Sequence, residues 1–279
     1  FRLTRQGFNF LALRELTNSK VIKSLGSVIG VGKESEVYSV EGEEDSLLCI
    51  KFHILGEQSF RQVKKKRDFH KRNDFLSRFE LSRKSAEKEF LYLEKLYKKG
   101  FPVPQPIKNN RHAVVMEYIH GEPLYVRRKE LRNPGKLYRE CMDLIVQFAH
   151  LGLIHGDFNE FNLLLDEDGD GDLFYYDDWK LYVFDLPQVV SVRHENAEEY
   201  FDRDVDCIRI FFKKRFHYEC DDYPQFKDVL GKRSPDPDHV NEDDDDVEDD
   251  HDDDAATIPL DDLRLENDDE NDDCLDVES

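Results

Sequence analysis

Three polar residues near the middle of the chain could carry out phosphoryl transfer. Asp157 and Asn162 lie in HGDFNEFN, between an apolar helix pattern and an apolar strand pattern, and Asp185 ends a further strand pattern. Asp157 could orient an attacking hydroxyl or water, or accept its proton, while oxygens of Asn162 and Asp185 could bind Mg²⁺. We therefore predict a catalytic Asp157 and two metal ligands. In the alternative interpretation, Asp157 is a turn residue and Asn162 a cap.

Two further segments could bind the phosphates of a nucleotide. Glycines in GVGKESEVY let backbone N–H groups approach phosphate closely, although a plain β-turn explains this segment equally well. Lys51 lies in the strand pattern CIKFH, where a buried ammonium needs a partner. We predict Glu89 on the following helix as that partner, with Glu87 and Glu94 as other choices. A lysine whose charge reaches solvent is the alternative.

Strand patterns precede helix patterns along the chain. Residues 1–16 are predicted as a short strand, a turn at Gly7 and an apolar helix. Three strands follow between residues 28 and 54, and the basic segment 56–83 is interpreted as a mobile connection. Helix patterns then occupy about residues 90–97, 134–148 and 197–216. Strands followed by helices are typical of a two-lobed α+β domain.

The charge of the chain is unevenly distributed. Acidic and basic residues balance through Arg233, whereas the last 46 residues hold 23 acidic residues and one basic residue, and so carry the whole net charge of −22. Such composition without aromatic residues is typical of disorder. The five cysteines form no CxxC pair, and no apolar run reaches the roughly 20 residues of a membrane span. These features favour an intracellular protein that has reduced thiols and does not enter a membrane.

Eight segments together carry a family resemblance that covers about residues 1–220. They are GVGKESEVY, CIKFH, KEFLYLEKLY, FPVPQPI, RHAVVMEYI, GLIHGDFNEFNLLL, VFDLPQVVS and NAEEYFDRDVDCI. The chain resembles the RIO family of atypical protein kinases, most closely its eukaryotic subfamily with an N-terminal winged helix. FRLTRQGFNFLAL resembles the end of that winged-helix domain. The resemblance implies an autophosphorylating serine/threonine kinase and ATPase that uses ATP and Mg²⁺.

The resemblance also implies a role for each site residue. Lys51 would contact the α and β phosphates, and Glu89 would anchor Lys51. Asp157 would be the catalytic aspartate, and Asp185 would both bind the metal and accept the phosphoryl group as an aspartyl phosphate. The implied metal ligands are Asn162 and Asp185. The implied nucleotide-binding residues are Gly30, Gly32, Lys33, Ser35, Val37, Lys51 and Glu89, together with the adenine-binding hinge residues Met116, Glu117 and Ile119.

The expected architecture is a protein-kinase-like α+β (RIO) fold with a truncated C-lobe. Its expected parts are the remnant of a winged-helix domain at 1–20, an N-lobe at 21–118 with the basic flexible loop 56–83, a C-lobe at 119–233, and a disordered acidic tail at 234–279. Asp185 is followed by Leu-Pro-Gln instead of Phe-Gly, and little chain remains for a peptide-docking region. This departure favours a slow ATPase switch over a kinase with many substrates.

Expected partners follow from the resemblance and from two charged segments. The family role implies late cytoplasmic maturation of the small ribosomal subunit, with its rRNA and ribosome assembly factors as partners and shuttling through the nucleus. The basic stretch 61–72 could contact rRNA phosphates, or be a solvated face. The tail also contains the spacing of a nuclear export signal, which is common by chance, at Ile258, Leu260, Leu263 and Leu265.

Two other functions and a calcium site are the alternatives. A small-molecule phosphotransferase shares the HGD-x₄-N pattern and the later aspartate, but would need a larger helical C-lobe. A non-catalytic nucleotide-binding scaffold would not need the complete set of Lys51, Asp157, Asn162 and Asp185. The insertion 166–177 resembles an EF-hand loop, but its twelfth position is Asp and strands flank it, which favours a solvated hairpin tip.

Overall fold

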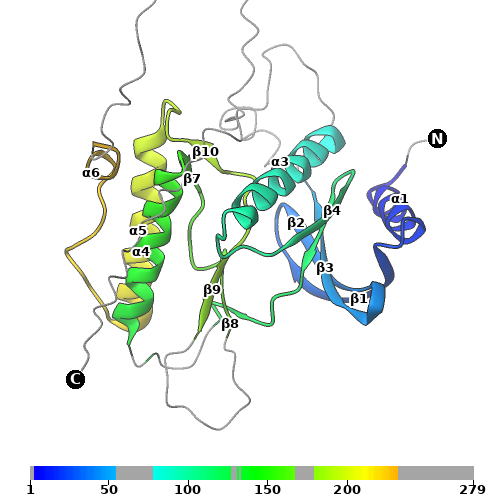
Figure 1. Cartoon of the computed structure of the whole chain (residues 1–279), viewed down its shortest axis with the longest axis horizontal. Helices are drawn as coiled ribbons and strands as arrows, with labels where there is room; N and C mark the ends of the chain where they lie inside the picture. The colour runs from blue at the N-terminus through cyan, green and yellow to red at the C-terminus, as the bar shows by residue number, and fades with distance from the viewer. Residues whose placement is uncertain (1–2, 55–77, 127–130, 132, 167–178, 232–279) are drawn as a thin grey trace, which may run out of the picture.

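A five-stranded antiparallel sheet forms the N-terminal lobe of the computed structural model, which describes residues 3–54, 78–126, 131, 133–166 and 179–231 (Figure 1). The strand order is β1-β2-β3-β5-β4. The bounds are β1 Ile22–Val31, β2 Ser35–Gly42, β3 Leu47–His53, β4 Pro106–Asn110 and β5 Ala113–Glu117. A short 3-10 helix, η1 Glu43–Asp45, connects β2 to β3. The three strands expected between residues 28 and 54 are therefore present, with β1 starting earlier.

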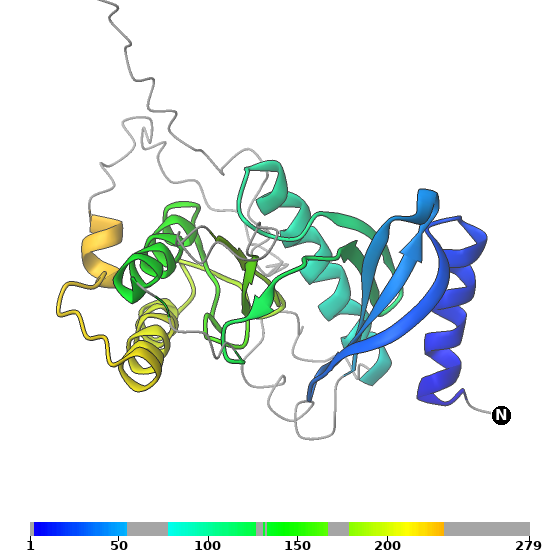
Figure 2. The same ribbon diagram turned by 90° about the horizontal axis from the view of Figure 1, so that it is seen from below.

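Two helices cover opposite faces of this sheet. Figure 2 shows the sheet between α1 (Arg5–Asn18) and α3 (Arg78–Lys98). Because side chains alternate along a strand, β3 presents Ile50 and Phe52 to the α1 side, and Cys49, Lys51 and His53 to the α3 side. The α1 side has its own small core, formed by Ala12, Leu16, Ile22, Val40, Ile50, Phe52, Ala113 and Val115.

Two predictions for this lobe were wrong at their boundaries. No strand or turn precedes the first helix within the described residues, because Thr4 Oγ1 accepts the N–H of Gly7 (3.2 Å) and caps α1 at Arg5. Helix α3 begins inside the predicted connection 56–83, because the ring of Phe79 stacks on Phe8 with centroids 4.0 Å apart. The part of that connection at 55–77 lies outside the described residues.

The second lobe combines helices with short strands. Its helices are α4 Pro134–His150, α5 Ala197–Phe216 and α6 Phe226–Gly231. One sheet has the order β6-β8-β9, with bounds Glu122–Pro123, Leu163–Asp166 and Lys180–Val183, and β7 (Leu153–Ile154) pairs with β10 (Val190–Ser191). Figure 1 shows α4 and α5 side by side, and they share buried apolar residues with β7 and β8. This core carries the loop between β7 and β8.

The two long helices of the second lobe, α4 and α5, lie where the sequence predicted them. The side chain of Asn133 accepts the N–H of Lys136 (3.0 Å), and Pro134 occupies the first turn of α4. The predicted bounds of α5 match those observed. No described helix has both the length and the apolar character needed to cross a bilayer. The insertion 167–178 and the tail 232–279 lie outside the described residues, so the calcium and tail hypotheses stay predictions.

Candidate active site

Helix α5 anchors the loop that carries Asp157. The buried carboxylate of Asp204 accepts the backbone N–H groups of Gly156 (2.8 Å) and Phe158 (2.9 Å), and Arg203 donates to the carbonyl oxygen of Gly156. Gly156 has a φ of 76°, which glycine adopts without strain. Burial raises the pKa of Asp204 to about 7, although the two N–H groups oppose this rise. Asp204 and Arg203 therefore position residues 155–162, which we call the catalytic loop because they include the predicted catalytic residue Asp157.

The carboxylate of Asp157 lies among amide donors. Asn159 Nδ2 donates to Oδ1 (3.0 Å), whereas Asn162 Nδ2 (3.2 Å) and Gln188 Nε2 (3.0 Å) donate to Oδ2. Burial raises the pKa of Asp157 to about 6, and the negative charge of Asp185 is the second cause. A carboxyl group with a pKa close to neutrality suits a proton acceptor in catalysis. Gln188 was not predicted; it belongs to the Leu-Pro-Gln segment that follows Asp185.

Lys51 connects the two lobes at this site. Its Nζ lies 2.6 Å from Glu89 Oε1 on α3 and 2.5 Å from Asp185 Oδ1 after β9. Burial alone would lower the pKa of Lys51, but the attraction of Asp185 and Glu89 outweighs it and raises the pKa. The ammonium therefore stays charged. The predicted pair of Lys51 and Glu89 is present, whereas Glu87 lies 3.7 Å from Arg83.

His155 bonds the catalytic loop to the segment that carries Asp185. Its Nδ1 accepts the backbone N–H of Asp157 (3.3 Å), so Nε2 carries the proton and donates to the carbonyl oxygen of Phe184 (3.3 Å). Burial lowers the pKa of His155 to about 4, which keeps the ring neutral. The N–H of Phe184 in turn donates to the carbonyl oxygen of Asn162 (3.1 Å). These bonds fix the two predicted metal ligands relative to each other.

The oxygens of Asn162 and Asp185 fit Mg²⁺. The amide nitrogen of Asn162 donates to the backbone oxygen (2.9 Å) and the carboxylate of Asp157, which leaves its amide oxygen to face a metal. Among the residues that the structure describes, no cluster of three His, Cys, Asp or Glu side chains could hold a metal by itself. Mg²⁺ suits such a sparse set, because it commonly takes its remaining ligands from nucleotide phosphates and water.

The glycine-rich segment forms the turn between β1 and β2. Gly32 N–H donates to the carbonyl oxygen of Ser35 (2.8 Å), and Lys33 is exposed within the turn. A Cβ atom at Gly30 would meet nothing within 4 Å. Packing within the protein therefore does not require glycine there, whereas a closely bound phosphate would. Val37 pairs with Lys51 across β2 and β3, so the turn continues into the strand beside the site.

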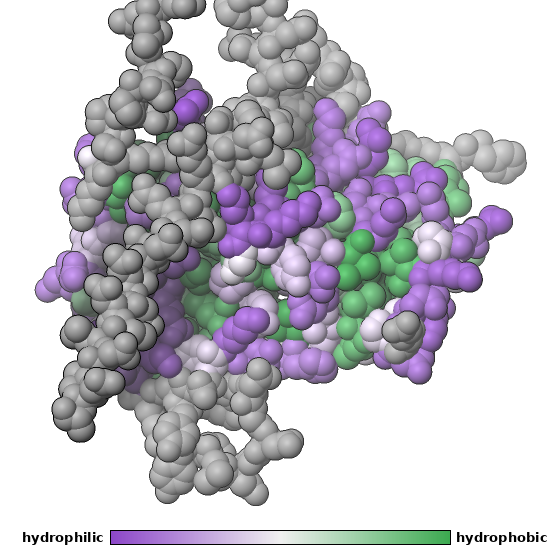
Figure 3. All heavy atoms as spheres, viewed as in Figure 1, coloured by the Kyte–Doolittle hydropathy of each residue, from purple (hydrophilic) through white to green (hydrophobic). Residues whose placement is uncertain are grey.

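Apolar surface lies next to this turn. Figure 3 shows hydrophobic surface over the strands β1 to β3. The exposed apolar side chains of β1 are Leu25, Val28, Ile29 and Val31. The last two flank Gly30.

The predicted hinge leaves the sheet at the end of β5. Met116 is buried and pairs with Cys49 of β3. Glu117 exchanges two bonds with Gln105, from its N–H to the Gln105 carbonyl oxygen (2.9 Å) and from the Gln105 N–H to its carboxylate (3.0 Å). Ile119 follows and is half-buried. The structure thus brings this segment to the same strand pair that carries Lys51.

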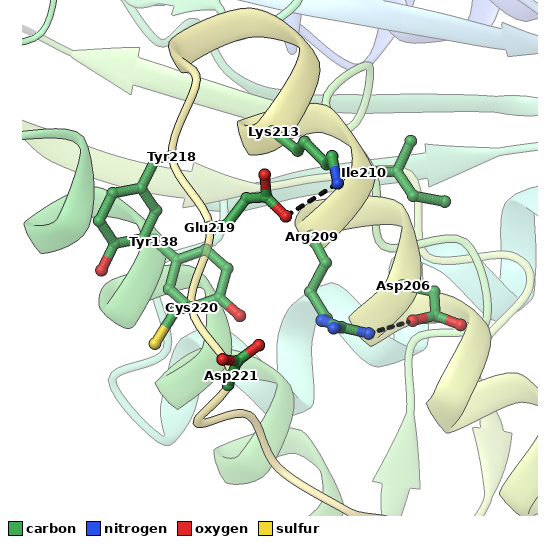
Figure 4. A pocket seen from close by; sticks show the side chains of 9 residues that line it. All are labelled: Tyr138, Asp206, Arg209, Ile210, Lys213, Tyr218, Glu219, Cys220 and Asp221. Atoms are coloured by element: carbon green, nitrogen blue, oxygen red, sulfur yellow. Dashed lines mark hydrogen bonds and ion pairs between the residues drawn. The ribbon is translucent and has the colours of Figure 1, made fainter.

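A pocket lies apart from the predicted site residues. It has a volume of about 150 Å³ and lies between α4, α5 and residues 218–221 (Figure 4). Four of its charged side chains form two pairs, with Arg209 3.0 Å from Asp206 and Lys213 2.8 Å from Glu219. None of the predicted site residues lines it.

Comparisons with known proteins identify relatives of this chain. A family model described as the RIO domain matches residues 36–225. Serine/threonine-protein kinase RIO2 of Caenorhabditis elegans is 46% identical over 236 residues, which cover 85% of this chain and 42% of the relative. RIO2 of Saccharomyces cerevisiae is 44% identical over 78% of this chain and 51% of its own length. The chain thus spans about two fifths to one half of these relatives.

Two further matches connect the sequence to archaea and to a solved structure. The RIO-type serine/threonine-protein kinase Rio2 of Methanocaldococcus jannaschii is 32% identical over 77% of both chains. The crystal structure of the Rio2 kinase–ADP/Mg²⁺–phosphoaspartate complex from Chaetomium thermophilum is 42% identical, has a TM-score of 0.73, and covers 85% of this chain and 69% of that one. This chain therefore belongs to the RIO family, and within that family it is similar to the Rio2 kinases.

Proposed function

We propose that this chain carries the phosphoryl-transfer site of an ATP-dependent RIO-type serine/threonine kinase that also acts as an ATPase. The observation that carries this proposal is the position of Lys51, which contacts Glu89 of one lobe and Asp185 of the other. A fixed cation beside two carboxylates, Asp157 and Asp185, matches what transfer of a γ-phosphoryl group needs. The names of the relatives and the ADP and Mg²⁺ of the Chaetomium complex support this assignment.

In this proposal, each lobe contributes part of the nucleotide site. The backbone of Gly30 and Gly32 and the side chains of Lys33 and Ser35 contact the phosphates, and Lys51 neutralises part of their charge. Adenine lies against the hinge Met116–Ile119, with Val37 on one side of the ring. Asn162 and Asp185 would hold Mg²⁺, which would neutralise the charge of the phosphate oxygens.

The proposed reaction has two steps. A carboxylate oxygen of Asp185 attacks the γ-phosphorus, the bond from that phosphorus to the β–γ bridging oxygen breaks, and ADP leaves. Water then attacks the phosphorus of the acyl phosphate, and Asp157 accepts a proton of the water. The bond from that phosphorus to the Asp185 oxygen breaks, which releases inorganic phosphate and restores the Asp185 carboxylate. Transfer to a serine or threonine hydroxyl would use Asp157 in the same way. The phosphoaspartate of the Chaetomium complex supports the first step.

We also propose a role in late cytoplasmic maturation of the small ribosomal subunit. Its support is the family resemblance together with the basic stretch 61–72, which would contact rRNA, and the tail motif Ile258, Leu260, Leu263 and Leu265, which would bind an export receptor. Both segments lie outside the described residues. Replacing Lys64, Lys65 and Lys66 by alanine should weaken rRNA binding and reduce its salt dependence. Unchanged affinity would contradict the proposed contact.

One experiment tests the catalytic proposal. The chain is incubated with Mg²⁺ and γ-labelled ATP, and phosphate release and protein-bound label are compared between wild type, Asp157→Ala and Asp185→Asn. We expect a hydroxylamine-labile label that Asp185→Asn abolishes, and release of phosphate that both variants lose. Equal turnover in all three proteins would overturn the assignment. Efficient phosphorylation of a small amino alcohol would favour a small-molecule phosphotransferase, and ATP binding without turnover a scaffold.

A further inference from the structure

His53 contacts the same carboxylate that anchors Lys51. Glu89 Oε1 lies 2.6 Å from Lys51 Nζ, and Glu89 Oε2 lies 2.5 Å from His53 Nε2. All three side chains are buried, with exposed fractions of 1% for Glu89, 4% for His53 and 7% for Lys51. A buried carboxylate is costly unless both of its oxygens have partners. Lys51 donates a hydrogen bond to Oε1, whereas Nε2 of His53 lies within ion-pair distance of Oε2, and the geometry of that contact is not that of a hydrogen bond.

The strand geometry explains why these two residues share one partner. Lys51 and His53 are two residues apart on β3, so their side chains leave the same face of the sheet, toward α3. The end of β3 is held in place, because the N–H of His53 donates to the carbonyl oxygen of His112 (2.8 Å) and that of Ile54 to Glu34 (2.6 Å). Both contacts to Glu89 are thus fixed by backbone structure.

The ionisation of Glu89 determines the charge that His53 faces. Burial alone would raise the pKa of Glu89, but the charges of Lys51 and His53 outweigh burial and lower it. An ionised carboxylate carries no proton, so its 2.5 Å contact with His53 is attractive only when Nε2 carries one.

We propose that His53 is a positioning residue for nucleotide binding, an inference that rests on the proposed function. Through its ion-pair contact with Oε2, His53 holds the plane of the Glu89 carboxylate so that only Oε1 faces Lys51. Without that contact, Oε2 turns to the nearest cation, and both oxygens bind Lys51. The ammonium is then drawn toward α3, away from Asp185 and from the place of the phosphates. His53 thus acts on ATP through Glu89 and Lys51.

Three variants test this role in the full chain. His53→Leu removes the ring that contacts Oε2 and should raise the KM for ATP and the Kd for Mg·ATP about tenfold, with kcat changed less than about twofold, as for loss of an interaction that acts equally on the bound state and the transition state. His53→Gln keeps an N–H donor and should restore most of the affinity. His112→Leu is the matched control, because His112 is also buried in this lobe but bonds to Asn9 (2.7 Å) instead of Glu89.

A double-mutant cycle separates positioning from general loss of structure. In a Glu89→Gln background, His53→Leu should have no further effect on the affinity for Mg·ATP. Additive losses in this cycle, or an equal loss in His112→Leu, would overturn the inference. Wild-type chain that fails to bind Mg·ATP would overturn the proposed function together with this inference. Normal wild-type binding with unchanged affinity in His53→Leu would overturn this inference alone.

Discussion

The carboxylate of Asp204 and the backbone N–H of Gly156 form a buried 2.8 Å hydrogen bond that ties α5 to the catalytic loop. Asp204→Ala would leave this N–H and that of Phe158 unpaired, and should lower the free energy of unfolding by about 3 kcal/mol. Urea denaturation followed by circular dichroism measures this loss. Asp202→Ala, on an exposed position of the same helix, is the control and should change stability by less than about 0.5 kcal/mol. Equal losses in the two variants would contradict the anchoring role.

Gly156 and Gly100 offer a matched pair for separating backbone strain from a steric clash. Their φ values are 76° and 75°. A Cβ at Gly156 would lie 2.9 Å from the carbonyl oxygen of Gln188, whereas at Gly100 it would meet nothing within 4 Å. Gly100→Ala should cost about 1 kcal/mol from backbone strain alone. Gly156→Ala should cost more and also reduce phosphate release, because Asp157 is the next residue. Indistinguishable melting temperatures and activities would show that no clash occurs.

Asp157 should make the stability of the chain depend on pH. Its pKa of about 6 in the folded chain lies above the ordinary value near 4, so between these values the folded chain binds more protons than the unfolded chain. The free energy of unfolding must therefore fall as the pH rises from about 4 to about 6. Asp157→Asn should lose less stability across this window, as measured by urea denaturation. The contribution of Asp204 has the same sign and is present in both proteins. Parallel curves would contradict the raised pKa.

Removing the cation at the centre of the site should affect both activity and stability. Lys51→Met leaves Glu89 and Asp185 without their shared partner and should destabilise the chain by about 3 kcal/mol or more. Phosphate release should fall at least about 100-fold, since a preorganised charge near the reacting phosphate is lost. The control is Lys95→Met, because Lys95 is also buried on the same lobe but lies outside the site. Retained turnover in Lys51→Met would argue against the proposed role.

Local signals in the sequence were enough to predict those helices whose ends are set by nearby residues. The Asn133–Pro134 cap marks the start of α4, and the helix pattern at 197–216 has the bounds of α5. The early start of α3 could not be predicted locally, because it depends on the contact of Phe79 with Phe8, far away in the chain. The two-residue strands β6, β7 and β10 are also defined only by their partners.

The site residues were likewise predictable where the signal is local and not predictable where it depends on distant contacts. Residue types and spacing indicated Asp157, Asn162, Asp185 and the pair of Lys51 with Glu89. They could not indicate that Gln188 donates to Asp157, because that contact requires the Leu-Pro-Gln segment to fold back onto the catalytic loop. The spacing of residues around His53 also gives no sign of its contact, because its partner Glu89 is a carboxylate on another element.

The bridge from Lys51 to Asp185 has a consequence for how a nucleotide would come and go. Because Lys51 already contacts an anion of the opposite lobe, the phosphates of an arriving nucleotide would exchange one negative partner for another. The buried ammonium would then never lose charge compensation during a catalytic cycle. Binding and release of the nucleotide become ligand-exchange steps at a single cation, and their rates should follow the lifetime of that one contact.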